Sequence, residues 1–524
     1  MHRNRLRPRA LFTAGLLAVL CPSAPATLHA QTEPFPGLDA YVERAMKDWD
    51  VPGLSLALVR NDTVVFARGY GVREEGRPER VDENTVFAAA SLTKSFTAAA
   101  AGILVDRGKL AWDTRVAELL PTFTLRDPWL TEHLTLRDLL THRTGVERGD
   151  WLRHSGQNDR SGVLRRMRYL GSDAQFRGAY LYSSLMYLVA GEAIAARAGI
   201  PWDEFVRREL FAPLGMERST TSVCQLPALG NLATPHERIG EAARPVVRLN
   251  LDNGAPAGSI NTSAADMARW IRMELAGGVY GGRRIVSDTS LAEMHAIQLP
   301  MRIRKTTPNW YPGIRFLGYG MGWVVQDYRG EKLLRHSGWI DGFRSEVALL
   351  PGKGFGLVVL TNRGGDNNIS DALRNHIVDR VLGAEPRDWS AQYLGQARDA
   401  RRAQDEAKRQ MYAARAAGTR PALPLAAYTG TYTDSLYGTA VVSQKNGALT
   451  VWLGPRNTAR MTHWQGDSFL APWDNPAYGE DVVKFTVGGG RATQMESNGL
   501  MFRRSSDLTA TEPFATPTLR CGRA

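Results

Sequence analysis

The sequence predicts an α/β fold in which one antiparallel sheet is flanked by terminal helices and carries a helical insertion, followed by a small all-β barrel-like domain. Two observations lead to this prediction. Runs rich in β-branched and aromatic residues occur at both ends of the segment 36–384, each beside a stretch with helical periodicity. After Leu425 the chain consists mainly of short β-rich runs. The length of 524 residues, with 43% hydrophobic and 23% charged residues, fits a soluble protein of two or three domains.

Residues 1–30 are expected to be a signal peptide. Four arginines precede the apolar run Ala10–Leu20, and small residues follow up to Ala26 or Ala30. The run is too short to span a membrane, and no later stretch reaches about 18 apolar residues. We therefore expect a periplasmic or secreted protein; the alternative is that this segment is a buried N-terminal helix.

The elements of the first domain, residues 31–388, follow in order. Residues 36–49 have helical periodicity, and Pro52-Gly53 separates them from two β-rich runs that form a hairpin. A mainly helical, loop-rich stretch is expected from about 90 to 320, beginning after a strand-like segment at 85–87. Three further strands and a closing helix complete the sheet. The expected strands are 54–59, 63–70, 332–336, 343–350 and 355–361, and the closing helix is 369–382.

The remaining chain is predicted to contain a linker and a second domain. Residues 389–420 are rich in Ala, Arg and Gln, which is typical of a solvated connecting helix. Residues 421–524 contain β-rich runs at 430–433, 439–443, 449–453 and 482–487. Asn446-Gly447 lies between two of these runs and is a strong hairpin signal.

Charge and cysteine content exclude some functions and leave others open. The formal net charge of +12 comes without a clustered basic stripe, so nucleic acid is not an expected partner, whereas weak attraction to anionic cell-envelope polymers is compatible with it. Neither cysteine nor histidine spacing indicates a metal site. Cys224 and Cys521 remain after signal removal, either as a disulfide or as two thiols. The oligomeric state stays open.

A candidate nucleophile lies at the start of a helical run. Ser91-Leu92-Thr93-Lys94 places a hydroxyl and an amine one turn apart, beside free backbone amides that favour developing negative charge. A buried lysine with a lowered pKa can activate such a serine. The alternative is a helix-capping Ser91 beside a solvated Lys94.

Two more motifs accompany this pair. Tyr182-Ser183-Ser184 precedes an amphipathic helix, and His336-Ser337-Gly338 is expected to end a strand before a tight turn from Trp339 to Gly342. In this order and spacing the chain resembles the class C β-lactamase and DD-peptidase superfamily, the penicillin-recognising, β-lactamase-related serine hydrolases. The resemblance covers about residues 36–384 and implies a β-lactamase/transpeptidase-like fold. The second domain resembles the lipocalin-like modules often appended to this superfamily.

The resemblance implies a role for each motif residue. Ser91 would be the acylated nucleophile, Lys94 its activating neighbour and Tyr182 the phenol that shuttles a proton. The backbone N–H groups of Ser91 and Trp339 would form the oxyanion hole. In the His-x-Gly triplet, Ser337 and Gly338 would contact the substrate, or Ser337 would only satisfy the turn. No metal or cofactor is expected.

Two positions depart from the family pattern. Ser184 stands where the family usually has asparagine, which weakens the expected recognition of a substrate amide. His336 replaces the lysine of most class C β-lactamases and is expected to assist proton transfer more than to anchor a carboxylate. The alternatives are that Tyr182 is a core aromatic, that His336 is a strand-end histidine, and that Tyr180 is the phenol instead of Tyr182.

The expected function is hydrolysis of an amide or ester through an acyl-serine. Short peptides, including peptides with D-residues, are the favoured substrates, ahead of β-lactams and small esters. A carboxylesterase or a weak β-lactamase is one alternative. A catalytically poor penicillin-binding or envelope-binding protein that uses the β-domain for contact is the other. Two other candidates, Ser55 in an expected strand and His142 in a family phrase, are expected to be structural.

Overall fold

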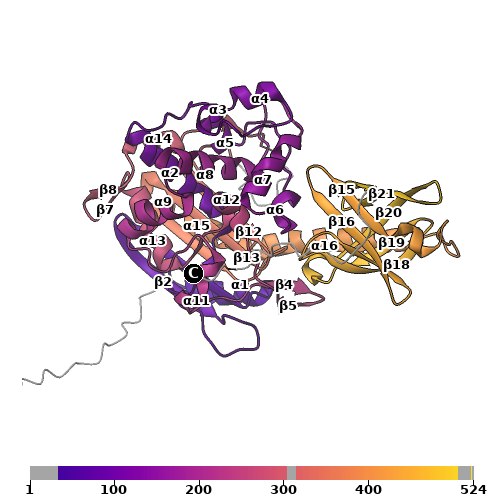
Figure 1. The fold of residues 1–524 in the computed structure, drawn as a ribbon. Helices are drawn as coiled ribbons and strands as arrows, with labels where there is room; N and C mark the ends of the chain where they lie inside the picture. The colour runs from indigo at the N-terminus through magenta and orange to yellow at the C-terminus, as the bar shows by residue number, and fades with distance from the viewer. Residues whose placement is uncertain (1–33, 304–313, 506–520, 522–524) are drawn as a thin grey trace, which may run out of the picture. The chain divides into compact units, whose positions relative to one another are not determined.

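The main sheet joins the two ends of the first domain. The computed structural model describes residues 34–303, 314–505 and 521. Its largest sheet has the order β2-β1-β14-β13-β12-β11-β10-β9, with antiparallel pairing between neighbours (Figure 1). The strands are β1 (Gly53–Arg60), β2 (Thr63–Gly71), β9 (Leu299–Pro300), β10 (Leu317–Tyr319), β11 (Val324–Tyr328), β12 (Glu331–Ile340), β13 (Phe343–Leu350) and β14 (Phe355–Thr361). Because β1 pairs with β14, the predicted α/β fold is confirmed.

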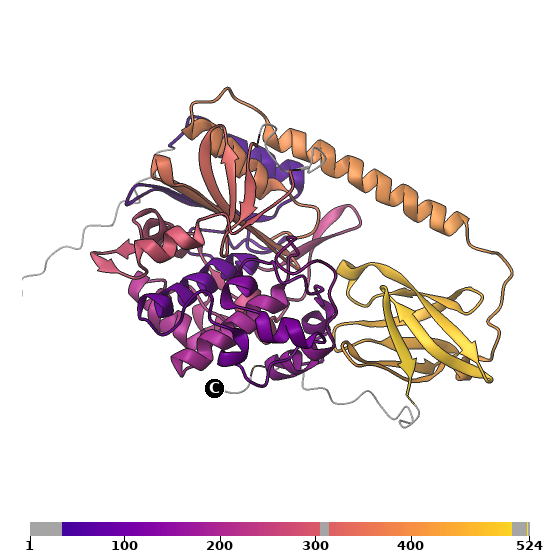
Figure 2. The same cartoon turned by 90° about the horizontal axis from the view of Figure 1, so that it is seen from above.

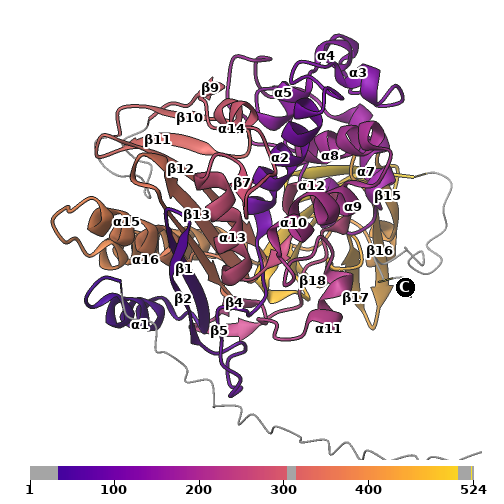
Figure 3. The ribbon, with the colours of Figure 1, turned by 90° about the vertical axis from the view of Figure 1, so that its left-hand side faces the viewer.

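Both faces of this sheet are buried. Along β1, Leu54, Leu56 and Leu58 point into one apolar cluster, whereas Ala57 and Val59 point into another, as the two-residue period of a strand requires. The first cluster is closed by three helices from the two ends of the domain, and the second by the helical insertion (Figure 3). The three helices are α1 (Leu38–Trp49), α15 (Ile369–Val381) and α16 (Trp389–Ala413).

The insertion is mainly helical, as predicted, but it also contributes strands. Its principal helices are α2 (Thr93–Asp106), α8 (Ser184–Ala198) and α13 (Ala264–Leu275). The missed strands β9, β10 and β11 have two to five residues, too few to display a two-residue hydrophobic period. The expected strand at 85–87 appears as β3 (Phe87–Ala88), which pairs with β6 (Asn261–Thr262) outside the main sheet.

Strand β12 is longer than the sequence suggested. The predicted strand ended at His336, but pairing with β13 continues through Trp339 and Ile340. The turn is therefore only Asp341-Gly342, with Gly342 at φ 77°. The expected turn from Trp339 to Gly342 is wrong in its extent, because Ser337 and Gly338 are weak strand formers that here continue a long hairpin.

Helix α16 covers most of the predicted linker, yet its first part is buried. Trp389, Tyr393 and Leu394 join the apolar cluster of α1 and α15. The indole of Trp389 donates to Asp379 Oδ2 at 2.8 Å, and that of Trp49 donates to Ser390 Oγ at 3.0 Å. The part beyond Ala397 is mostly exposed and leads toward the second domain (Figure 2).

The second domain is a closed eight-stranded barrel, in which β15 pairs with β22. This confirms the expected barrel-like domain. The strands are β15 (Gly430–Asp434), β16 (Gly438–Lys445), β17 (Ala448–Trp452), β18 (Thr458–Gln465), β19 (Ser468–Pro472), β20 (Glu480–Gly488), β21 (Arg491–Ser497) and β22 (Leu500–Arg504). Four of them, β18, β19, β21 and β22, were not predicted, since β19 and β22 have only five residues and the sequences of β18 and β21 are mostly polar.

One disulfide ties the C-terminal tail to the insertion. Cys224 and Cys521 are bonded, with their Cα atoms 5.1 Å apart, so the sequence's open question is resolved in favour of a disulfide. Within the described ranges, none of the helices combines the length and apolarity needed to cross a membrane. The predicted signal peptide at 1–30 lies outside the described residues.

Candidate active site

Ser91 sits on a sharp turn between β3 and α2, in the short 3-10 helix η1 (Ala90–Leu92). Ala90, directly before it, has φ 49°, a left-handed conformation that is uncommon for a residue with a side chain and is often found at functional sites. The turn packs on β12 and β13, because Ser345 Oγ donates to the Ala89 carbonyl at 2.7 Å. A Cβ on Gly338 would lie 2.3 Å from that same carbonyl oxygen, so the glycine allows the close approach.

Lys94 is buried beneath Ser91, on the first turn of α2. Its Nζ lies 3.0 Å from Ser91 Oγ and donates to the Ala257 carbonyl at 2.7 Å. Burial, with a further contribution from the guanidinium groups of Arg153 and Arg148, holds the pKa of Lys94 well below its usual value. A lowered pKa increases the fraction of neutral amine, whose lone pair can accept the serine proton.

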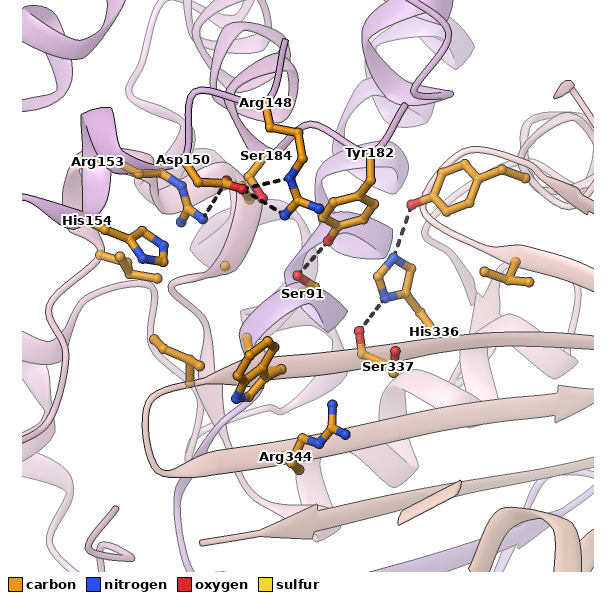
Figure 4. A pocket seen from close by; sticks show the side chains of 18 of the residues that line it. Ser91, Arg148, Asp150, Arg153, His154, Tyr182, Ser184, His336, Ser337 and Arg344 are labelled. Carbon is orange, nitrogen blue, oxygen red and sulfur yellow. Dashed lines mark hydrogen bonds and ion pairs between the residues drawn. The ribbon is translucent and has the colours of Figure 1, made fainter. Parts of the chain in front are cut away.

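Tyr182 contacts Ser91 from the opposite side. Its hydroxyl donates to Ser91 Oγ at 2.7 Å, as Figure 4 shows. Burial raises the pKa of Tyr182 to about 12, so the phenol is protonated at neutral pH. Tyr180, the rival phenol, also lines the pocket, but the tyrosine in contact with Ser91 is Tyr182.

His142 holds the segment that carries Tyr182. Its carbonyl accepts from the Leu181 N–H at 2.9 Å, its Nδ1 accepts from the Ser183 N–H at 3.1 Å, and its ring centroid lies 4.4 Å from that of Tyr182. His142 itself has φ 57°. It is structural, as expected from the sequence, but it supports the site directly by fixing the residues on both sides of Tyr182.

The end of β12 borders the pocket with a free strand edge. Pairing with β11 reaches only Arg335, while Ser337 and Trp339 beyond it line the pocket. Trp339 is 63% exposed. Backbone groups on such an edge can bind an extended ligand, and the Trp339 N–H is the expected second oxyanion donor.

His336 lies in the pocket wall with both ring nitrogens bonded. Its Nδ1 donates to the Ser337 carbonyl at 2.7 Å, so Nε2 is the acceptor for the Tyr319 hydroxyl at 3.0 Å (Figure 4). Burial, and next the ammonium form of Lys94, lower the pKa of His336 to about 3. The histidine is therefore neutral, and the structure brings it next to Tyr319 rather than to Ser91.

Ser184 lies at the first position of α8, 4% exposed and with its Oγ 3.5 Å from Lys94 Nζ. The residue that departs from the family pattern is thus inside the site and close to Lys94. Ser55, by contrast, is buried in β1, where its hydroxyl donates to the Asp82 carbonyl at 3.2 Å, in agreement with the structural role expected for it.

The cavity around Ser91 has a volume of about 510 Å³ and an arginine-rich wall that the sequence did not reveal. Arg148 Nε donates to Asp150 Oδ2 at 2.8 Å, and Arg153 Nη2 lies 3.5 Å from Asp150 Oδ1 (Figure 4). Arg344 from β13 lines the cavity near Trp339, with its Cζ 5.7 Å from the indole centroid. The dense charges of residues 147–154 were the available signal, but charge runs are common on surfaces.

The site offers the groups for acyl transfer: a hydroxyl in contact with a buried amine and with a protonated phenol. In the part of the chain that the structure describes, no cluster of three or more His, Cys, Asp or Glu residues is arranged to hold a metal ion.

Comparisons with known proteins agree with this fold. The model of the Beta-lactamase family matches residues 38–381, and that of a domain of unknown function, DUF3471, matches residues 414–510. The chain is 30% identical over 415 residues to the unguisins hydrolase ungD' of Aspergillus campestris, covering 76% of this chain and 75% of that protein.

Two solved structures share the fold. An octameric penicillin-binding protein homologue from Pyrococcus abyssi has a TM-score of 0.58 at 19% identity and covers 89% of this chain and 98% of its own. A class C β-lactamase from Rhodobacter sphaeroides has a TM-score of 0.54 at 21% identity, with 66% and 99% covered.

An antiparallel sheet with a helical insertion and a serine-bearing turn packed on its strands defines a β-lactamase/transpeptidase-like protein. The match over residues 38–381 makes the assignment specific: this chain belongs to the Beta-lactamase family of serine hydrolases.

Proposed function

We propose that this protein is an exported hydrolase that cleaves an amide or ester bond through an acyl intermediate on Ser91. The observation that carries the proposal is the position of Ser91 Oγ, 3.0 Å from Lys94 Nζ and 2.7 Å from the Tyr182 hydroxyl. A serine hydroxyl is a weak nucleophile unless a neighbouring base takes its proton.

The proposed reaction assigns one proton transfer to each neighbour. As Ser91 Oγ attacks the carbonyl carbon, the neutral Lys94 amine takes the serine proton, and the backbone N–H groups of Ser91 and Trp339 stabilise the oxyanion. Tyr182 donates its proton to the leaving nitrogen or oxygen as the scissile bond breaks, and the ammonium of Lys94 then restores that proton. Water reverses these transfers and releases the acid from Ser91.

The favoured substrates are short peptides, including peptides that contain D-residues. The free edge of β12 supports this choice because it offers backbone hydrogen-bonding groups to an extended chain beside Ser91. His336 is assigned to shaping this wall through Tyr319, since its ring is neutral and bonded. Ser337 and Gly338 belong to the same wall.

A carboxylesterase is the second candidate, because Ser184 replaces the asparagine expected to recognise a substrate amide. Comparing turnover of a short acyl ester, a D-alanyl peptide and a chromogenic cephalosporin separates the two candidates from a weak β-lactamase. A catalytically poor penicillin-binding or envelope-binding protein would be labelled on Ser91 without turning over.

The test of the proposal is an adduct on Ser91. A fluorophosphonate should label this serine in the unmodified protein, as located by mass spectrometry, and Ser91→Ala should lose both the label and turnover. Ser55→Ala is the matched control and should keep both. Labelling at a different serine, or undiminished turnover by Ser91→Ala, would contradict the mechanism.

We also propose action in the periplasm or after secretion. The leader-like segment 1–30 supports it, and so does the disulfide between Cys224 and Cys521, since such bonds persist in oxidising compartments. Cleavage near Ala26 or Ala30 in the exported protein, read by N-terminal sequencing, tests this placement.

A further inference from the structure

We propose that the barrel is part of the specificity apparatus: through residues 150–157 it holds the arginine wall of the catalytic cavity in place and so sets the affinity for substrates with an anionic acyl group. The part of this inference that concerns substrates rests on the proposed function. The part that concerns structure, that the barrel orders this segment, is independent of any activity.

The segment has two faces with different neighbours. On one side, Asp150 and Arg153 line the cavity that contains Ser91, together with Arg148 just before the segment. On the other side, Trp151 packs against the apolar core of the barrel. Because Trp151 and Arg153 of one short helix, α6 (Trp151–His154), serve the two faces, a displacement on the barrel side moves the cavity side as well.

Gln157 fastens the end of this segment to strand β16 of the barrel and to the loop that follows β17. Its Nε2 donates to the carbonyls of Thr439 at 2.9 Å and Leu453 at 2.8 Å, and its Oε1 accepts from the Thr439 N–H at 3.1 Å. The Gln157 side chain thus forms hydrogen bonds with the barrel backbone in the way that a neighbouring strand would. Three hydrogen bonds from one amide fix both its position and its orientation.

The β17–β18 loop of the barrel lies so close to the same segment that their backbones are in contact. A Cβ on Gly454 would lie 2.3 Å from the Ser155 carbonyl oxygen, and Gly454 has φ 137°. From the same loop, Arg456 Nη2 donates to the Asn250 carbonyl at 2.8 Å, next to Leu251, which lines the cavity. The barrel therefore touches two cavity-forming segments.

Little within α6 stabilises it without these contacts. The helix has four residues and no side-chain hydrogen bond at its N-cap, and a helix of this length is not stable alone in water. Figure 1 shows α6 on the side of the insertion that adjoins β16. Its order must come from packing: Leu152 is buried in the core of the first domain and Asn253 Nδ2 donates to the Arg153 carbonyl at 3.0 Å. The contacts with Trp151, Ser155 and Gln157, in contrast, are made by the barrel.

The wall carries charge, so its position matters to charged ligands. The described residues that line the cavity include three arginines, Arg148, Arg153 and Arg344, and a single carboxylate, that of Asp150. His154 and His336 are neutral because burial lowers the pKa of each to about 3. An acyl group with a terminal carboxylate would be attracted to this wall, and one with a methyl end would not.

The experiment alters the contact between the barrel and the segment that carries the arginine wall. Gly454→Ala places a methyl group against Ser155 without changing the catalytic domain. Gly447→Ala is the matched control: it lies in the β16–β17 turn of the same barrel, also at positive φ (72°), and its Cβ would meet nothing within 4 Å. Gln157→Ala is a second variant, which tests the same contact if the first disturbs the barrel's own fold.

The substrates are mono-4-nitrophenyl adipate and 4-nitrophenyl hexanoate, which share the leaving group and the acyl length but differ in terminal charge. We expect Gly454→Ala and Gln157→Ala to raise KM for the adipate about fivefold or more, with kcat and the hexanoate KM changed less than about twofold. Hydrogen exchange of amides 151–157 should also become faster. Gly447→Ala should change neither.

Equal KM changes for both esters, or unchanged exchange at 151–157 in both folded variants, would overturn the inference. If the unmodified protein hydrolyses neither ester, the proposed function fails on these substrates, while the exchange experiment still decides whether the barrel orders the wall. The two failures are thus distinguishable.

Discussion

The two sides of the catalytic cavity are built in different ways. Ser91 and Lys94 stand where a buried helix meets the central sheet, fixed by contacts from residues as distant in sequence as Ala257 and Ser345. Opposite them, Arg148 and Arg153 of the arginine wall stand on a loop and a single helical turn, which the barrel contacts from outside. A rigid side suits bond cleavage, which requires fixed geometry, whereas a side made of loops can vary with the substrate.

This difference predicts that changes on the serine side slow the reaction of all substrates, whereas changes on the wall alter KM for only some. The largest expected effect is that of Lys94→Met, which should lower kcat at least about 10³-fold for the adipate and hexanoate esters alike. Lys109→Met, at an exposed lysine of the same domain, is the control and should retain activity. Comparable losses in both variants would contradict the role of Lys94.

The same substitution should also stabilise the protein, since the pKa of folded Lys94 is lowered from its usual value of 10.5. Between the folded and unfolded pKa values the unfolded chain binds more protons, so burying Lys94 costs stability that is regained as pH rises through this window. The Tm of Lys94→Met should thus exceed that of the unmodified protein at pH 7, with a smaller difference near pH 10. A pH-independent difference in calorimetry would refute this account.

The serine side was also the more predictable from sequence. Ser91, Lys94 and Tyr182 belong to local motifs with fixed spacing, and the β-rich runs at both ends of the domain indicated the sheet that carries the serine turn. The wall left no such signal, because Trp151 and Gln157 acquire their roles only by contact with barrel residues about 300 positions later in the sequence. For the same reason, the sequence predicts that the first turns of α16 are solvated, although Trp389 and Tyr393 are buried there.

The next effect should come from Gly338→Ala, which tests how rigid the serine side is. The added Cβ would lie 2.1 Å from Ser345 Oγ and 2.3 Å from the Ala89 carbonyl oxygen, so the turn before Ser91 must shift. Overpacking of this kind costs about 1–3 kcal/mol, and we expect Ser91 labelling by a fluorophosphonate to slow roughly 10- to 100-fold. Gly395→Ala, where nothing lies within 4 Å, should label normally. Normal labelling of Gly338→Ala would mean that the turn tolerates movement.

A smaller and selective effect is expected for Arg148→Gln on the wall. Its guanidinium lowers the pKa of Lys94, so its removal should raise that pKa and move the acid limb of kcat/KM to higher pH for both esters. KM should rise about fivefold for the adipate only. The charged and titratable groups that act on Lys94 or contact it are Arg148, Asp150, Arg153, Tyr182, Tyr187, His142 and His336. Arg165→Gln, on an exposed stretch of the insertion, serves as the control. If the acid limb does not move, the charge of Arg148 does not influence the pKa of Lys94.

The smallest effect is expected for Ser184→Asn, at the boundary between the two sides. Ser184 Oγ lies 3.5 Å from Lys94 Nζ and borders the cavity, so a longer side chain here would reach both the amine and a bound substrate. A carboxamide can donate to and accept from a substrate amide at once, which one hydroxyl cannot do. Such a contact is worth about 1 kcal/mol, or roughly fivefold in kcat/KM. The gain should therefore appear for a chromogenic cephalosporin and remain under about twofold for the hexanoate ester, which lacks an amide. Ser184→Ala, which adds no such group, should show no gain on the cephalosporin. If Ser184→Asn improves both substrates equally, residue 184 acts through Lys94 rather than by contacting the substrate, and it belongs to the rigid side of the cavity.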